Sequence, residues 1–222
     1  MRFRLVYTGE IKASQNAHPA NGVEKHVAHK HNIRKHFHQQ LRRLWTTDKF
    51  LSEHRVDPAA YGVDVSASQV GAFWGPDPNN QIALSAAVAN LYQEHSYRFV
   101  PLVREQWFLT CSLRILFLRQ DGVNTTLHSG DIDNRVKTII DALTKPSHAA
   151  HLQSHPKPND DEDPFYCLLE NDRLVTGLQI ETDTLLTPPT GNSSEGLRQA
   201  SIVVSVEVRP TYVTNFNLSF AS

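Results

Sequence analysis

The chain has 222 residues, of which 40% are hydrophobic and 20% charged, and its formal net charge is -1. This composition is typical of globular proteins and excludes a disordered chain, so we expect a single domain over residues 1–222. No apolar stretch is long enough to span a bilayer, and the two cysteines lack a CxxC spacing, so we expect a cytoplasmic protein without membrane contact.

The near-zero net charge hides a segregation of charge along the chain. Residues 25–43 contain six lysines or arginines and no acid, whereas residues 159–172 contain six acids and no base. The first region is suited to phosphates and the second to cations.

The first predicted elements follow from the spacing of apolar residues. Residues 2–7 alternate and predict an opening strand that ends at Gly9. Apolar residues at helical spacing over residues 29–45 predict an amphipathic helix with basic residues and His38 on its wetter sides. We expect this helix to contact phosphates, such as those of a nucleic-acid backbone, through its basic residues: Lys30, Arg34, Lys35, Arg42 and Arg43.

The middle of the chain is less regular. Proline and glycine interrupt residues 46–78, which predicts irregular structure. Residues 84–92 fit one face of a helix that Asn79 or Asn80 would cap. Residues 107–118 have the composition of one long strand.

A further helix is predicted over residues 131–143, with Asp133 or Asn134 as its cap and Pro146 as its stop. The polar residues 147–164 predict a mobile loop. Residues 174–180 and 201–209 predict two final strands.

Asp131 and Asp133 are two residues apart at a predicted loop or strand end. The two-residue period of extended backbone would point both carboxylates the same way. Like charges at short range need a cation, and magnesium commonly binds one or two carboxylates together with water and phosphate. The pair therefore predicts a magnesium site.

Asn134, Lys137 and Asp141 share one face of the helix that follows. Lys137 would neutralise a phosphate, and Asn134 would orient a carboxylate or a metal-bound water. Alternatively, Asp133 only caps the helix, and Lys137 forms a surface pair with Asp141. The residues alone do not decide between these two interpretations.

Two sequence runs resemble the RusA family of Holliday-junction resolvases. Residues 131–143, DIDNRVKTIIDAL, resemble the family pattern Asp-x-Asp-Asn-x-x-Lys followed by Asp-x-Leu. Residues 170–175, ENDRLV, resemble its second acidic element, in which Asp172 matches an essential aspartate. Asn171 stands where many members have another aspartate.

The resemblance implies an α+β fold, a mixed β-sheet flanked by helices, in a homodimer that cuts opposing strands of a four-way DNA junction. A magnesium ion, for which manganese can substitute, would activate the attacking water. By matching position, Asp131, Asp133 and Asp172 would bind the metal and Lys137 would assist catalysis. The supporting residues would be Asn134, Asp141 and Asn171.

The chain also departs from the family pattern. Most members are shorter, so residues of about 46–98 are an expected insertion and residues 147–164 an added loop. A lysine often found after the second acidic element is missing. Two alternatives therefore stay open: a DNA-binding or assembly protein with weak or no catalysis, and a nuclease that acts on flaps, nicked duplex or RNA.

The histidines also raise the question of zinc. His26, His29 and His31 include a spacing that does not share a helical face. A second group, at positions 148, 151 and 155, lies in the predicted loop. We expect solvated or phosphate-touching histidines, and a solvated acidic run at residues 160–163.

Overall fold

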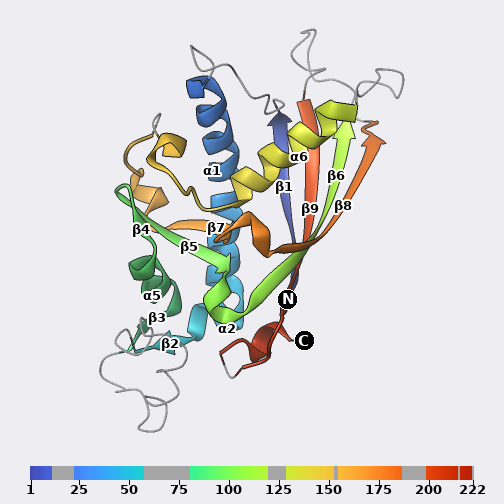
Figure 1. The fold of residues 1–222 in the computed structure, drawn as a ribbon. Coiled ribbons are helices and arrows are strands. Elements are labelled where there is room, and N and C mark those ends of the chain that lie inside the picture. Colours follow the sequence, from blue (N-terminus) through green and yellow to red (C-terminus); the bar gives the residue numbers. More distant parts are fainter. Residues whose placement is uncertain are drawn as a thin grey trace.

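The computed structural model describes residues 1–11, 23–57, 81–119, 129–152, 155–186, 199–214 and 216–221. Within these ranges the chain is a mixed α+β protein with mixed sheets, as the sequence predicted (Figure 1). Its α-helices are α1 (Val23–Thr47), α2 (Lys49–Glu53), α5 (Leu84–Leu91) and α6 (Ser129–Leu143). Its strands are β1 (Arg2–Glu10), β2 (Arg55–Val56), β3 (Ile82–Ala83), β4 (Gln93–Glu94), β5 (Tyr97–Val103), β6 (Leu109–Arg119), β7 (Phe165–Leu169), β8 (Val175–Thr184) and β9 (Gln199–Pro210).

The larger sheet has the strand order β1-β9-β6-β8. β9 is antiparallel to both β1 and β6, whereas β8 is parallel to β6. Alternate residues of β9, such as Ile202 and Val204, are buried beneath the helices, which confirms the predicted two-residue alternation. β1 runs through Gly9 and does not end there. A Cβ at Gly9 would lie 2.5 Å from the Tyr7 hydroxyl oxygen, so the close approach of that ring explains the glycine.

A second, smaller sheet has the order β4-β5-β7, with β5 parallel to β7. Neither β5 nor β7 was predicted. Both strands are almost entirely buried, and strands buried on two faces lack the alternation that identifies a strand in a sequence. Pro101 inside β5 further disguises it. Trp107 is in the core but precedes β6, in the 3-10 turn Glu105–Trp107.

Helix α1 packs against α6, β7 and β1 and so joins the two sheets. Its apolar stripe, including Ile33, Phe37 and Leu41, is fully buried, which confirms the predicted amphipathic helix. Figure 1 shows α6 crossing the face of the larger sheet, from the tips of β6 and β8 to the neighbourhood of β7. None of the helices in the described ranges is both long and apolar enough to cross a membrane.

The described part of residues 46–98 belongs to the main core. Leu84 and Val88 of α5 share one buried cluster with Leu5 and Ile202 of the larger sheet. α5 begins after Ala83, so neither Asn79 nor Asn80 is its cap, and no side chain caps it. The helix α2 stands where irregular structure was expected, and residues 58–80 lie outside the described ranges.

Candidate functional site

Helix α6 carries the first acidic motif, but it begins earlier than predicted. It starts at Ser129, so Asp133 and Asn134 lie inside the helix and do not cap it. Residues two apart on a helix point about 200° away from each other, so the two-residue period expected for Asp131 and Asp133 does not apply. The side chain of Asp131 lies outside the described part of the structure.

Asp133 and Lys137 are both exposed and are four residues apart, on one face of α6. Asp141 does not form the surface pair with Lys137 that the sequence offered as an alternative. Its carboxylate lies 2.6 Å from the Lys30 ammonium of α1. Asp133 and Lys137 make no ion pair with any other described residue. The cap is wrong because Asp133 lies inside α6, and the pair is wrong because Asp141 binds Lys30 and not Lys137.

The second acidic motif lies at the other end of α6. Asp172 is exposed in the 3-10 turn Asp172–Leu174, which Asn171 caps by accepting a hydrogen bond from the Arg173 N–H at 3.1 Å. This turn follows β7, and the Lys145 N–H just after α6 donates to the Leu169 carbonyl of β7 at 2.8 Å. The structure therefore places Asp172 beside the C-terminal end of α6.

The length of α6 separates the two acidic motifs. Asp133 precedes Leu143, the last residue of the helix, by ten positions, which is about 15 Å along the helix axis. Among the side chains that the structure describes, no three His, Cys, Asp or Glu lie close enough to share a metal ion. The placement of α6 and the Asp172 turn thus does not bring Asp133 and Asp172 of one chain to a shared ion.

The predicted basic surface of α1 is largely turned inward. Arg34 is only 3% exposed, and its guanidinium donates to the Asp141 carbonyl at 3.0 Å. Burial lowers the pKa of Arg34 to about 10. Lys35 lies 2.7 Å from the almost buried carboxylate of Glu162. The prediction that Arg34 and His38 face water is wrong, because both are buried.

Two of the five predicted DNA contacts, Arg42 and Arg43, are well exposed. Arg42 also donates to the Asp161 carbonyl at 3.1 Å. If this helix meets a phosphate backbone, Arg42 and Arg43 are the residues best placed to do so.

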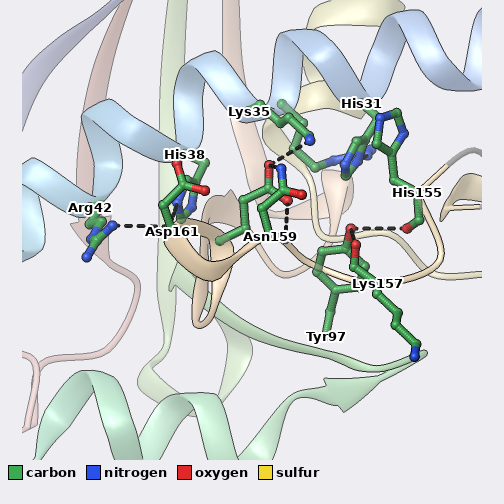
Figure 2. A network of polar contacts seen from close by, with 11 residues as sticks. His31, Lys35, His38, Arg42, Tyr97, His155, Lys157, Asn159 and Asp161 are labelled. Carbon is green, nitrogen blue, oxygen red and sulfur yellow. Dashed lines mark hydrogen bonds and ion pairs between the residues drawn. The ribbon is translucent and has the colours of Figure 1, made fainter.

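The basic and acidic regions face each other in the structure. Figure 2 shows Lys35, His38 and Arg42 of α1 lying over the segment that contains Asn159 and Asp161. Burial alone would raise the pKa of Glu162, but a hydrogen bond from the Asn159 N–H and the Lys35 ammonium lower it. An ion pair between Lys35 and Glu162 joins the two charged regions, and Glu162 is not the solvated residue that was expected.

Histidines from the two candidate zinc groups also meet. The His31 and His155 rings are 4.5 Å apart, and burial lowers the pKa of His31 to about 3 (Figure 2). His38 accepts a hydrogen bond from the Tyr166 N–H at 2.8 Å, and its other ring nitrogen is 3.1 Å from the Asp161 carbonyl oxygen. These interactions are structural.

The sequence contains a signal that could have revealed this network. His31, Arg34 and His38 follow the spacing of three and four residues that Leu41 and Trp45 continue, so all five belong to one helical stripe. A search for hydrophobic periodicity misses His31, Arg34 and His38, because it assumes that polar residues face water.

No protein-family model, curated protein or solved structure matches this chain. The resemblance to the RusA family therefore rests on the sequence pattern between residues 131 and 175.

Proposed function

We propose that the chain is a magnesium-dependent DNA endonuclease that acts as a homodimer on branched DNA, with four-way junctions as the first substrate class. One structural observation supports this proposal. Asp133 and Lys137 are exposed on one face of α6 and have no ion-pair partner among the described residues, whereas Lys30 and Asp141 nearby are paired with each other.

The chemistry of these side chains suits a phosphodiester. The compact ammonium of Lys137 would stabilise negative charge on a phosphate, and the Asp133 carboxylate is an oxygen ligand of the kind that magnesium prefers. The magnesium requirement, with manganese as a substitute, rests on the sequence resemblance, because one chain does not bring Asp172 to Asp133.

A second candidate function is a DNA-binding or assembly protein without catalysis. The observation in its favour is the separation of Asp172 from Asp133 by most of the length of α6. A chain that lacks an assembled acidic site would keep its fold but would not cleave DNA. The two candidates differ in one measurable property, which is hydrolysis of DNA.

The test incubates the purified chain with four-way-junction, flap, nicked and linear DNA and with RNA, each with and without magnesium or manganese. We expect the parent to cut junction DNA only with metal. Asp133→Asn should lower the rate by about a thousandfold or more, while DNA binding is retained or slightly tighter because one negative charge is removed. Lys137→Ala should also be inactive, with weaker binding.

Asp160→Asn is the matched control, because Asp160 is an exposed aspartate outside the motif, and this variant should cut like the parent. A parent that binds junctions but cuts no substrate would support the second candidate. Equal cleavage by Asp133→Asn and the parent would overturn the assignment of Asp133. Cleavage of flaps or RNA, but not junctions, would change the substrate class.

A further inference from the structure

The two edge strands of the larger sheet differ in how their backbones are covered. At the β1 edge, the Val6 N–H donates to Gln40 Oε1 at 2.9 Å, and Gln40 Nε2 donates to the Val6 carbonyl at 2.7 Å. The Gln40 amide of α1 thereby makes the two bonds that a neighbouring strand would make. This contact occupies the backbone of Val6, in the middle of the β1 edge, and so hinders pairing with a further strand there.

The opposite edge, β8, is long and exposed. It has ten residues and pairs with β6, and no described strand adds to its other side. Leu178 and Ile180 are 47% and 36% exposed. An exposed edge of this length that carries apolar side chains is a template for another strand.

The register of β8 against β6 assigns its side chains to two faces. Leu178 and Ile180 stand beside Leu113 and Ile115, on the face that the helices cover. Gln179, Glu181 and Asp183 stand on the opposite, open face. Two carboxylates along the edge disfavour a nucleic acid as the occupant, because they repel phosphates.

We propose that β8 is the surface through which two copies of this chain associate, as antiparallel strands related by a two-fold axis at Gln179. In this register Leu178 of each copy stands opposite Ile180 of the other, so the exposed apolar residues cover each other. Glu181 stands opposite Gly177, so the two Glu181 carboxylates do not face each other. Pairing at this position is self-complementary in apolar contact and keeps like charges from standing directly opposite each other.

Charge also limits the alternatives. An axis moved to Glu181 would place the two Glu181 carboxylates directly opposite each other, which is destabilising. A register shifted by an odd number of residues would pair the helix-covered face of one copy with the open face of the other. The inference extends the homodimer of the proposed function but is argued from β8. A dimer without nuclease activity would refute the proposed function and leave this inference standing. DNA cleavage by a monomer would refute this inference and leave the nuclease activity standing.

The first experiment measures self-association by sedimentation velocity over a range of protein concentrations. We expect the parent to be dimeric at tens of micromolar and Leu178→Lys to shift the dissociation constant at least tenfold toward monomer. Val6→Lys is the matched control, because Val6 is 48% exposed on the protected edge β1, and it should dimerise like the parent. Far-UV circular dichroism checks that both variants are folded.

A second experiment tests the register by disulfide capture. Gln179→Cys should form a covalent dimer on mild oxidation, because the two-fold axis places its two copies within disulfide distance. Glu181→Cys should not, since its two copies would lie about 13 Å apart along the strands. The native Cys111 and Cys167 are buried, which keeps the background low.

A monomeric parent, or a dimer weakened by Val6→Lys and not by Leu178→Lys, would overturn the proposal. Capture through Glu181→Cys in preference to Gln179→Cys would overturn the register.

Discussion

At the scale of single residues, Arg34 shows how burial changes the role of a charged side chain. Its guanidinium is packed between α1 and α6, where it donates to the Asp141 carbonyl and cannot reach a solvent-borne phosphate. A buried cation held by a hydrogen bond contributes to stability chiefly because its removal leaves polar partners unsatisfied.

We therefore predict that Arg34→Ala lowers the free energy of unfolding by about 2–4 kcal/mol, through the lost hydrogen bond and the cavity that the shorter side chain leaves. Arg43→Ala on the same helix is the control and should change stability by less than about 0.5 kcal/mol, because Arg43 is exposed. Urea denaturation measures both variants. Equal stabilities of the two would show that the Arg34 guanidinium is not held inside.

At the scale of elements, the segment of residues 155–162 is tied to the core although the sequence predicted a loose loop. The Tyr97 hydroxyl of β5 lies 3.1 Å from the carbonyl oxygens of both His155 and Lys157. Burial, with a smaller contribution from Glu162, raises the pKa of Tyr97 to about 12, which agrees with a hydroxyl held inside the protein.

Tyr97→Phe should loosen this segment without unfolding the protein. Loss of the hydroxyl removes the hydrogen bond but keeps the ring stacked on Phe99. We expect a loss of about 1–2 kcal/mol and faster amide exchange confined to residues 155–162. Hydrogen exchange followed by mass spectrometry measures this, and a uniform increase over the whole chain would contradict a local anchor.

The elements also show which parts of the fold could be predicted from the sequence. The alternating strands β1 and β9 and the amphipathic helices α5 and α6 have a periodic pattern and were predicted within a few residues, and β6 was predicted from its composition. Helix α1 and strand β8 were also predicted, but α1 begins six residues before its predicted start and β8 extends four residues beyond its predicted end. β5 and β7 were missed because both of their faces are buried. The start of α6 was misplaced because an aspartate before an apolar run is typical of a cap, and here the helix extends beyond it.

The candidate site was less predictable than the fold. The motif from Asp131 to Lys137 identified a helix on which Asp133 and Lys137 have no ion-pair partner among the described residues. Sequence spacing could not reveal that Asp172 lies at the far end of that helix, because the path of residues between two motifs depends on tertiary packing.

At the scale of the whole molecule, buried histidines couple the fold to pH. Burial lowers the pKa of His31 to about 3 and lowers that of His38 as well. In the folded state both pKa values lie below the ordinary 6.5, so the unfolded chain takes up protons first as the pH falls. Their contribution to stability is complete above pH 6.5 and declines below it, down to about pH 3 for His31.

We predict that His31→Phe makes the free energy of unfolding fall less steeply as the pH drops below 6.5, the acid limb of the stability curve. Between pH 6.5 and 3, the slope of the unfolding free energy against pH should fall by about one proton, or about 1.4 kcal/mol per pH unit. His36→Gln, at an exposed position of the same helix, should leave the slope as in the parent. Urea titrations at half-unit pH intervals measure it. Parallel acid limbs for His31→Phe and the parent would refute a protonation-resistant His31.

Gln40 has a consequence for how large an assembly can grow. Two copies joined at β8 would present a β1 strand at each outer end of a continuous sheet, and open ends of that kind would permit endless lateral growth. At each outer end, the Gln40 amide would occupy the Val6 backbone groups that a further strand would need for pairing. This contact would favour a finite pair over a sheet that keeps growing.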